Sequence, residues 1–326
     1  MEKQKRLLIV DGLNIYMRSY IANPSISTNG DPIGGCKGFL MSLQKIVRNV
    51  NPDRIVVVWD GNGGSARKRK LCPGYKGGRK PVRLNRAVRD LLTEAQEQAN
   101  KAWQYTNTID YLDLMPVTQI CINGFEADDI ISMISGSPKY KGWQKVIISS
   151  DKDFLQLLDG ETVLYRPIQK KAWTKNTVIE EYGISPENFV IARAIAGDKS
   201  DNLAGIKGAG LPTIAKRLSF LIDDEMHTLN EVYDHCANAE GKLKFYERIV
   251  EDWDRVETNY KVMNLTPPSI SVHGRKKVNY ALDNFEFELN ATELKKCSVD
   301  HGFGSYDWSE LMAMLRGVVE KNKLVA

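Results

Sequence analysis

The sequence lacks the marks of a membrane-spanning or disulfide-stabilised protein. No apolar run approaches the roughly 18 residues that cross a membrane, and the apolar run behind the charged N-terminus is too short for a signal peptide. The 5 cysteines among 326 residues are scattered and include no C-x-x-C pair, which argues against a disulfide framework or a zinc site. We therefore expect no membrane partner and a location in a reducing cytoplasm.

Acidic residues are absent from one long segment. Residues 61–89 contain none, although the whole chain has a net charge of only +4. Ten lysines and arginines occupy this segment, including the run Arg67, Lys68, Arg69 and Lys70. Charges of one sign gathered in this way favour a phosphate-binding surface. On charge patterning alone, a solvated basic face is the alternative.

The chain does have short apolar runs that alternate with helical patterns. Runs rich in β-branched residues are typical of strands buried on both faces, and they lie at residues 6–11, 54–60, 117–122, 145–151 and 162–166. Helical patterns lie at residues 37–50, 126–134 and 154–158, then at 83–103 and through most of 182–263. The alternation predicts an α/β fold with a central, mostly parallel sheet flanked by helices. The last sixty residues give no clear pattern.

Three of the expected strands end in aspartate, at Asp11, Asp60 and Asp151. In open α/β sheets, sites form at the carboxyl ends of the strands, so these side chains should meet at one edge. For any one of them, a turn or a helix cap is a sufficient explanation. The three together favour a functional site.

Further carboxylates cluster in short motifs. They are Glu126, Asp128 and Asp129 at the start of an expected helix, Asp153 beside Asp151, and the pair Asp198 and Asp201. Like charges packed so closely repel unless a cation compensates them. The motifs contain no His or Cys, so their hard oxygens favour Mg²⁺, with Mn²⁺ able to substitute. Nine carboxylates exceed the needs of one Mg²⁺, so two metals are expected, and no calcium-loop spacing is present.

A glycine-rich turn follows the last acidic pair. Gly205, Gly208 and Gly210 precede a helix expected to begin near Leu211. Glycines let the backbone approach a ligand closely, and amides at such a turn can hold a phosphate. The turn would grip a nucleic-acid backbone without reading bases.

Taken together and in order, these motifs resemble the 5′-nuclease superfamily. This superfamily includes bacteriophage 5′→3′ exonucleases and RNase H, flap endonucleases, and the 5′ nuclease domain of bacterial DNA polymerase I. The matching segments are residues 11–18 (DGLNIYMR), 58–60 (VWD), 75–79 (YKGGR), 126–129 (EADD), 151–153 (DKD) and 197–202 (GDKSDN), with the glycine turn after them. The resemblance covers about residues 7–218.

The resemblance implies a role for each matching residue. The first metal site would use Asp11, Asp60, Glu126, Asp128, Asp129 and Asp151, and the second Asp153, Asp198 and Asp201. Lys76 and Arg79 would contact the scissile phosphate. Tyr75 could stack on a base or pack in the protein. Other DNA contacts would come from Arg18, Arg67, Lys68, Arg69, Lys70, Gly205, Lys207, Gly208, Gly210 and Thr213, and Ser200 could hold a potassium ion.

The resemblance also implies an architecture and an activity. A PIN-like catalytic domain over residues 1–180 would carry a helical arch at 62–110. A helical region over 181–326 would contain a helix-hairpin-helix, or helix-three-turn-helix, near 197–218. The expected activity is structure-specific 5′ nuclease cleavage of DNA or RNA–DNA hybrids, as in primer removal during replication. Expected partners are DNA with a 5′ flap, a nick or an RNA primer, and a single-strand-binding protein.

The protein should be a monomer in a bacterial cell or a phage-infected host. A non-catalytic nucleic-acid binding protein on the same fold is one alternative activity. A PIN-type ribonuclease is the other, but such domains are usually shorter and lack the glycine turn and the basic arch.

Overall fold

A six-stranded sheet forms the centre of the molecule. The computed structural model describes residues 4–239, 243–304 and 306–323. Its strands lie in the order β3 (Val117–Cys121), β2 (Arg54–Trp59), β1 (Arg6–Asp11), β4 (Gln144–Ile148), β5 (Thr162–Arg166) and β6 (Lys171–Trp173). The first five are parallel, and β6 runs antiparallel to β5. The predicted mostly parallel sheet is confirmed, and all five parallel strands end at the same edge.

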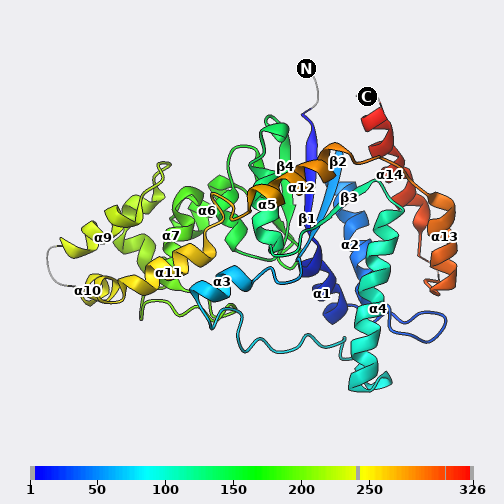
Figure 1. Cartoon of the computed structure of the whole chain (residues 1–326), viewed down its shortest axis with the longest axis horizontal. Coiled ribbons are helices and arrows are strands. Elements are labelled where there is room, and N and C mark those ends of the chain that lie inside the picture. The colour runs from blue at the N-terminus through cyan, green and yellow to red at the C-terminus, as the bar shows by residue number, and fades with distance from the viewer. Residues whose placement is uncertain (1–3, 240–242, 305, 324–326) are drawn as a thin grey trace.

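Helices flank this sheet, and further helices extend away from it at one end of the molecule (Figure 1). In chain order they are α1 (Gly12–Ala22), α2 (Gly34–Val50), α3 (Ala66–Leu71), α4 (Glu94–Asp113), α5 (Ala127–Ser135), α6 (Lys175–Tyr182), α7 (Pro186–Ala196), α8 (Leu211–Arg217), α9 (Leu229–Ala237), α10 (Lys244–Glu251), α11 (Trp253–Met263), α12 (Val272–Asp283), α13 (Ala291–Asp300) and α14 (Trp308–Lys323). Short 3₁₀ turns are η1 (Arg89–Leu91), η2 (Pro138–Tyr140), η3 (Asp153–Leu157) and η4 (Ser219–Ile222). Helix α8 begins where the sequence predicted, whereas the 3₁₀ turn η3 takes the place of the α-helix that was expected at residues 154–158.

The two faces of the sheet pack on different helices. Successive strand residues point to opposite faces. Ile9 therefore lies in one buried cluster with Ile130 of α5 and Phe189 of α7, whereas Val10 lies in a second cluster with Phe39 of α2 and Leu311 of α14. The strands are buried on both sides, which explains why they read as continuous apolar runs. The C-terminal helix α14 therefore belongs to the same core as the sheet. The division into domains at residue 180 stays a prediction.

The expected helix at residues 83–103 begins later than predicted. Helix α4 starts at Glu94 because Thr93 and Gln96 form a capping box, each side chain accepting a hydrogen bond from the other residue's backbone. The stretch before it is mostly irregular and is held by Glu97, which accepts from Leu84 N at 2.6 Å and pairs with Arg83 at 2.9 Å. The basic arch segment thus consists of the short helix α3, a long and mostly irregular segment, and helix α4.

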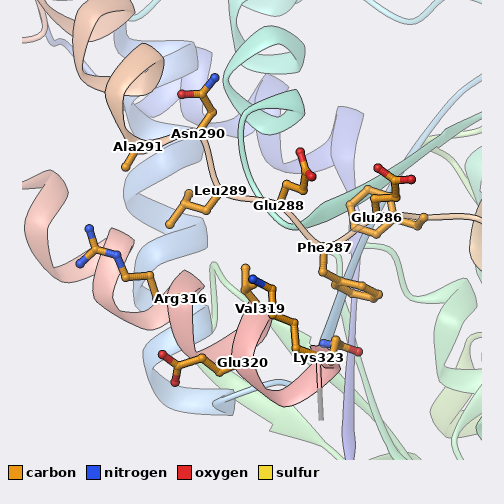
Figure 2. Close-up of a pocket in the computed structure, with 12 residues that line it drawn as sticks. Glu286, Phe287, Glu288, Leu289, Asn290, Ala291, Arg316, Val319, Glu320 and Lys323 are labelled. Atoms are coloured by element: carbon orange, nitrogen blue, oxygen red, sulfur yellow. The ribbon is translucent and has the colours of Figure 1, made fainter. Parts of the chain in front are cut away.

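The C-terminal helices enclose a surface groove of about 960 Å³. Figure 2 shows Phe287 and Leu289 on the segment between α12 and α13, facing Arg316 and Val319 of α14. None of the nine candidate metal carboxylates lines this groove. Within residues 4–239, 243–304 and 306–323, no helix is both long and apolar enough to span a membrane.

Candidate active site

The three strand-end aspartates meet at one edge of the sheet, as predicted. Strands β2, β1 and β4 are neighbours, so Asp60, Asp11 and Asp151 follow adjacent parallel strands. Asp11 accepts hydrogen bonds from Ser149 Oγ at 2.7 Å and from Asn14 N at 3.2 Å, where it caps α1. Asp60 accepts from Ala127 N at 2.8 Å. This hydrogen bond places the start of α5, with Glu126 and Asp128, beside the strand-end aspartates.

The environment of these aspartates disfavours negative charge. Burial, followed by repulsion from Asp128, raises the pKa of Asp11 to about 7. The same two causes raise the pKa of Asp60. Burial and then repulsion from Asp153 raise the pKa of Asp151 well above its usual range. Closely spaced carboxylates that repel one another in this way are stabilised when a cation lies between them.

Three side chains of the arch segment converge on Glu126. Lys68 Nζ lies 2.7 Å from one carboxylate oxygen and Lys76 Nζ lies 2.6 Å from the other. Tyr75 Oη donates to Glu126 at 3.3 Å. Burial opposes ionisation, but the two ammonium groups outweigh it and lower the pKa of Glu126 to about 2. Lys68 also lies 3.6 Å from Asp128.

The members of the basic run differ sharply in position. Arg67, Arg69 and Lys70 are exposed and available to a polyanion, whereas Lys68 is 5% exposed and points into the acidic cluster. Tyr75 is also buried, with both lysine ammoniums over its ring, so it packs in the protein instead of presenting a surface for a base. Lys68 and Tyr75 therefore contact the carboxylates of the cluster. Lys68 does not lie on the outer, DNA-facing surface where the sequence predicted it.

Lys68 should act as a competitor for cations. We expect Lys68→Met to bind Mn²⁺ about tenfold more tightly, because an ammonium that competes for Glu126 and Asp128 is removed. Isothermal titration calorimetry measures the change. Lys70→Met, an exposed position on the same helix, should leave the affinity unchanged. Weaker Mn²⁺ binding by Lys68→Met would show that Lys68 organises the carboxylates without competing for them.

A second carboxylate group surrounds Arg193, which the sequence-based reasoning missed. Arg193 Nη2 lies 3.0 Å from Asp153 Oδ1 and is also ion-paired with Asp198. Asp201 pairs instead with Arg79, whose Nε donates to the Ser200 carbonyl oxygen at 3.2 Å. Asp153, Asp198 and Asp201 thus lie beside cations of the chain itself. The sequence signal for Arg193 is a single cation within the apolar run at residues 189–196 of helix α7, five residues before Asp198.

Asp129 and Ser200 have local partners. Asp129 is buried and accepts from Ser269 N at 2.8 Å, which ties α5 to the segment leading into α12. Ser200 donates to Asp198 Oδ1 from its backbone N at 2.7 Å and its Oγ at 2.6 Å. Both residues lie beside the cluster, and their assigned roles toward metal ions stay predictions.

The carboxylate set fits hard divalent cations in its chemistry. All nine donors are oxygen ligands, the type that Mg²⁺ and Mn²⁺ prefer. In the part of the chain that the structure describes, no three His, Cys, Asp or Glu side chains are already gathered as a ligand group. Lys68, Lys76 and Arg193 instead form ion pairs with carboxylates that metal ions would share.

Comparison with known proteins identifies the family. The family model described as "5′-3′ exonuclease, N-terminal resolvase-like domain" matches residues 6–183, more than half of the chain. The chain belongs to the 5′-3′ exonuclease family. The matched region contains every candidate carboxylate except Asp198 and Asp201, which follow it.

Relatives of this family support the assignment. The 5′-3′ exonuclease of Aquifex aeolicus is 28% identical over 271 residues, covering 80% of this chain and 82% of the relative. DNA polymerase I of Caldicellulosiruptor bescii is 30% identical over 246 residues, covering 73% of this chain and 26% of that protein. The chain thus spans about a quarter of the length of the DNA polymerase I relatives that it matches.

Solved structures show the same fold. A bacteriophage T5 5′-exonuclease with bound zinc ions superposes with a TM-score of 0.63 at 17% identity, covering 97% of this chain and 99% of the other. Flap endonuclease-1 from Methanococcus jannaschii gives a TM-score of 0.55 at 14% identity, covering 99% and 94%. The predicted family and fold are confirmed.

The glycine turn of this family member is tightly built. Ile206 N donates to the Ile195 carbonyl oxygen at 2.8 Å, and Asn259 Nδ2 donates to the carbonyl oxygens of Ala194 and Ala204 at 2.9 and 3.0 Å. Ile206 is buried, while Lys207, Gly208 and Gly210 face outward and Thr213 is half-buried. Gly208 has a φ of 82°, a conformation that favours glycine. The turn is therefore a rigid loop whose exposed backbone can meet a ligand.

Gly205 is the position where this turn tolerates least change. A Cβ there would lie 2.0 Å from the Ala196 carbonyl oxygen, so the backbone must move. We expect Gly205→Ala to lower the free energy of unfolding by about 1–3 kcal/mol, as overpacking typically does, and to weaken binding of duplex DNA. Urea unfolding and fluorescence anisotropy measure the two effects. Gly160→Ala is the matched control, because its Cβ meets no atom within 4 Å.

Proposed function

We propose that this protein is a structure-specific 5′ nuclease that hydrolyses phosphodiesters of DNA or RNA–DNA hybrids with two divalent metal ions. One observation carries the proposal: carboxylates from three neighbouring strand ends and from α5 meet between the basic arch segment and the glycine turn. Carboxylates alone would suit many metal enzymes, but phosphate-binding elements beside them favour a nucleic-acid substrate. The family supports the 5′ polarity.

Mg²⁺ is the ion that we propose for the cluster. Asp11, Asp60, Glu126, Asp128, Asp129 and Asp151 would hold one ion, and Asp153, Asp198 and Asp201 the other. When bound, paired divalent ions lower the pKa of water and stabilise the leaving oxygen in phosphodiester hydrolysis. A potassium ion at Ser200 and the glycine turn would add a further contact to duplex DNA.

Other residues of the chain would bind and position the substrate. Lys76 and Arg79 are paired with Glu126 and Asp201. In the complex with substrate they would also contact the scissile phosphate and stabilise its negative charge. The exposed Arg67, Arg69 and Lys70 would guide the 5′ strand under the arch, and the glycine turn would hold the duplex. Ser149, which donates to Asp11 and accepts from Asp151 N at 3.1 Å, keeps two of the carboxylates in place.

The biological setting is part of the proposal. We propose that the protein acts as a monomer in the cytoplasm of a bacterial cell or a phage-infected host. Its substrates would be 5′ flaps, nicks and RNA primers left by replication, with a single-strand-binding protein as partner. The resemblance to DNA polymerase I relatives supports this role.

A substrate panel tests the proposed activity. Flap, nicked and RNA–DNA hybrid duplexes, labelled in turn at the 5′ and 3′ ends, are incubated with the protein and Mg²⁺. We expect short 5′-end products from each, and none when EDTA replaces Mg²⁺. Products that start from the 3′ end, or cleavage that persists in EDTA, would refute the proposal. The sizes of the 5′ products separate exonuclease steps from flap cleavage.

A further inference from the structure

Two arginines reach one serine at the edge of the acidic cluster. Arg18 extends from α1, and Arg166 is the last residue of β5. Arg166 Nη2 donates to the Ser150 carbonyl oxygen at 2.8 Å, and Arg18 Nη1 donates to the Ser150 hydroxyl. Ser150 directly precedes Asp151, so both guanidinium groups lie beside the carboxylates of the candidate active site.

Neither guanidinium is neutralised by an ion pair among the residues that the structure describes. Arg166 is 8% exposed, and its Nε and Nη1 are buried without a hydrogen-bond acceptor. Asp151 attracts Arg166 but does not reach ion-pair distance. Arg79 and Arg193, in contrast, are both paired with aspartates. Arg18 and Arg166 are therefore neighbouring cations that lack an anion.

A purely structural role explains only part of this arrangement. A tether for the Ser150 carbonyl accounts for one N–H group of Arg166, but not for the two buried groups without an acceptor. It also gives no reason for a second positive charge beside the first, since like charges repel. Burying charged donors without acceptors is strongly unfavourable. An anion bound here would accept hydrogen bonds from these groups and so offset the desolvation free energy of the buried guanidinium.

We propose that Arg18 and Arg166 together bind one phosphate group of the substrate strand, next to the phosphate held at the carboxylates. This inference rests on the proposed nuclease function. Guanidinium groups match phosphate because their forked N–H groups contact two oxygens at once. Arg18 is half-buried and Arg166 nearly fully buried, so Arg18 is the outer donor of the pair and Arg166 the inner one.

The test measures binding, separately from cleavage. The affinity of a 5′-flap duplex is measured by fluorescence anisotropy in EDTA, for the wild type and for Arg166→Gln, which keeps a donor for the Ser150 carbonyl but loses the charge. Arg316→Gln, an exposed position on α14, is the control, and thermal unfolding checks that each variant is folded. We expect Arg166→Gln to bind about tenfold more weakly, with the slope of log affinity against log salt reduced by about one.

Neutral linkages locate the phosphate. Methylphosphonates replace single phosphodiesters along the flap strand. At one linkage the wild type should lose about tenfold in affinity while Arg166→Gln loses nothing more, because the contact is already absent. Parallel losses at every linkage, or wild-type affinity of Arg166→Gln, would overturn the inference. If the wild type cleaves 5′ ends in Mg²⁺ but shows no such linkage, only this inference fails; absence of cleavage would instead refute the proposed function.

Discussion

Replacing Asp128 with Asn should lower kcat for 5′ cleavage on the order of a thousandfold, which corresponds to about 4 kcal/mol in the activation free energy. Asp128 is the residue whose charge reaches most of the cluster, since it raises the pKa of Asp11, Asp60 and Asp151. Asn keeps the shape but removes the charge that a divalent cation needs. Single-turnover cleavage of a 5′-flap duplex in Mg²⁺ measures the effect.

The affinity of Asp128→Asn for DNA should stay close to that of the wild type. The arch segment and the glycine turn, which we propose as the main DNA contacts, are unchanged in this variant. Asp254→Asn, an exposed position on α11, controls for the loss of one negative charge elsewhere. If Asp128→Asn cleaves at the rate of this control, Asp128 is not a metal ligand and the assignment of the first metal site fails.

Lys76→Ala should slow the chemical step about a hundredfold with little change in KM, as expected when one preorganised charge beside the reacting phosphate is lost. Lys76 is held in a left-handed backbone conformation, with a φ of 56°, and its N donates to the Asp201 carbonyl oxygen at 2.8 Å. Its ammonium is 2.6 Å from Glu126 Oε1. The side chain is thus fixed at the carboxylates before any substrate arrives.

Two companion measurements sharpen this prediction. Lys80→Ala, an exposed position in the same segment, should retain wild-type kcat. Lys76→Ala should also leave the Mg²⁺ concentration for half-maximal rate within a few-fold of the wild type if its main role is toward phosphate. A large shift in that concentration, with kcat restored at high Mg²⁺, would assign Lys76 to organising Glu126 instead.

The position of the strand-end acids could be predicted because it follows from chain topology. Asp11, Asp60 and Asp151 each end a run that is buried on both faces, and the carboxyl ends of parallel strands share an edge. The start of α5 was also predictable, since acids in a first turn mark a helix N-terminus. These features depend on local pattern and on one general rule of sheet geometry.

The position of the cations could not be predicted in the same way. Arg67, Lys68 and Lys70 are equivalent in a charge pattern, yet only Lys68 is buried, because the placement of α3 beside α5 selects one helix face. Arg193 is part of the site because it pairs with Asp153 and Asp198, which lie 40 residues before it and 5 after it in the sequence. Such pairings arise from tertiary contacts that no periodicity encodes.

The start of α4 was predicted wrongly for a different reason. Residues 83–93 contain helix-compatible side chains, so the periodicity extended the helix too far. The capping box of Thr93 and Gln96 was present in the sequence and marks the true start. Here the capping box, and not the periodicity, fixes where the helix begins.

The central claim is that the acidic cluster holds two divalent ions, and anomalous diffraction from crystals soaked in Mn²⁺ tests it most directly. We expect two anomalous peaks. One should lie among Asp11, Asp128 and Asp151, and the other beside Asp153, Asp198 and Asp201, with the ammonium of Lys68 displaced from Asp128. Mn²⁺ bound only outside these carboxylates, or no peak at saturating Mn²⁺, would contradict the account.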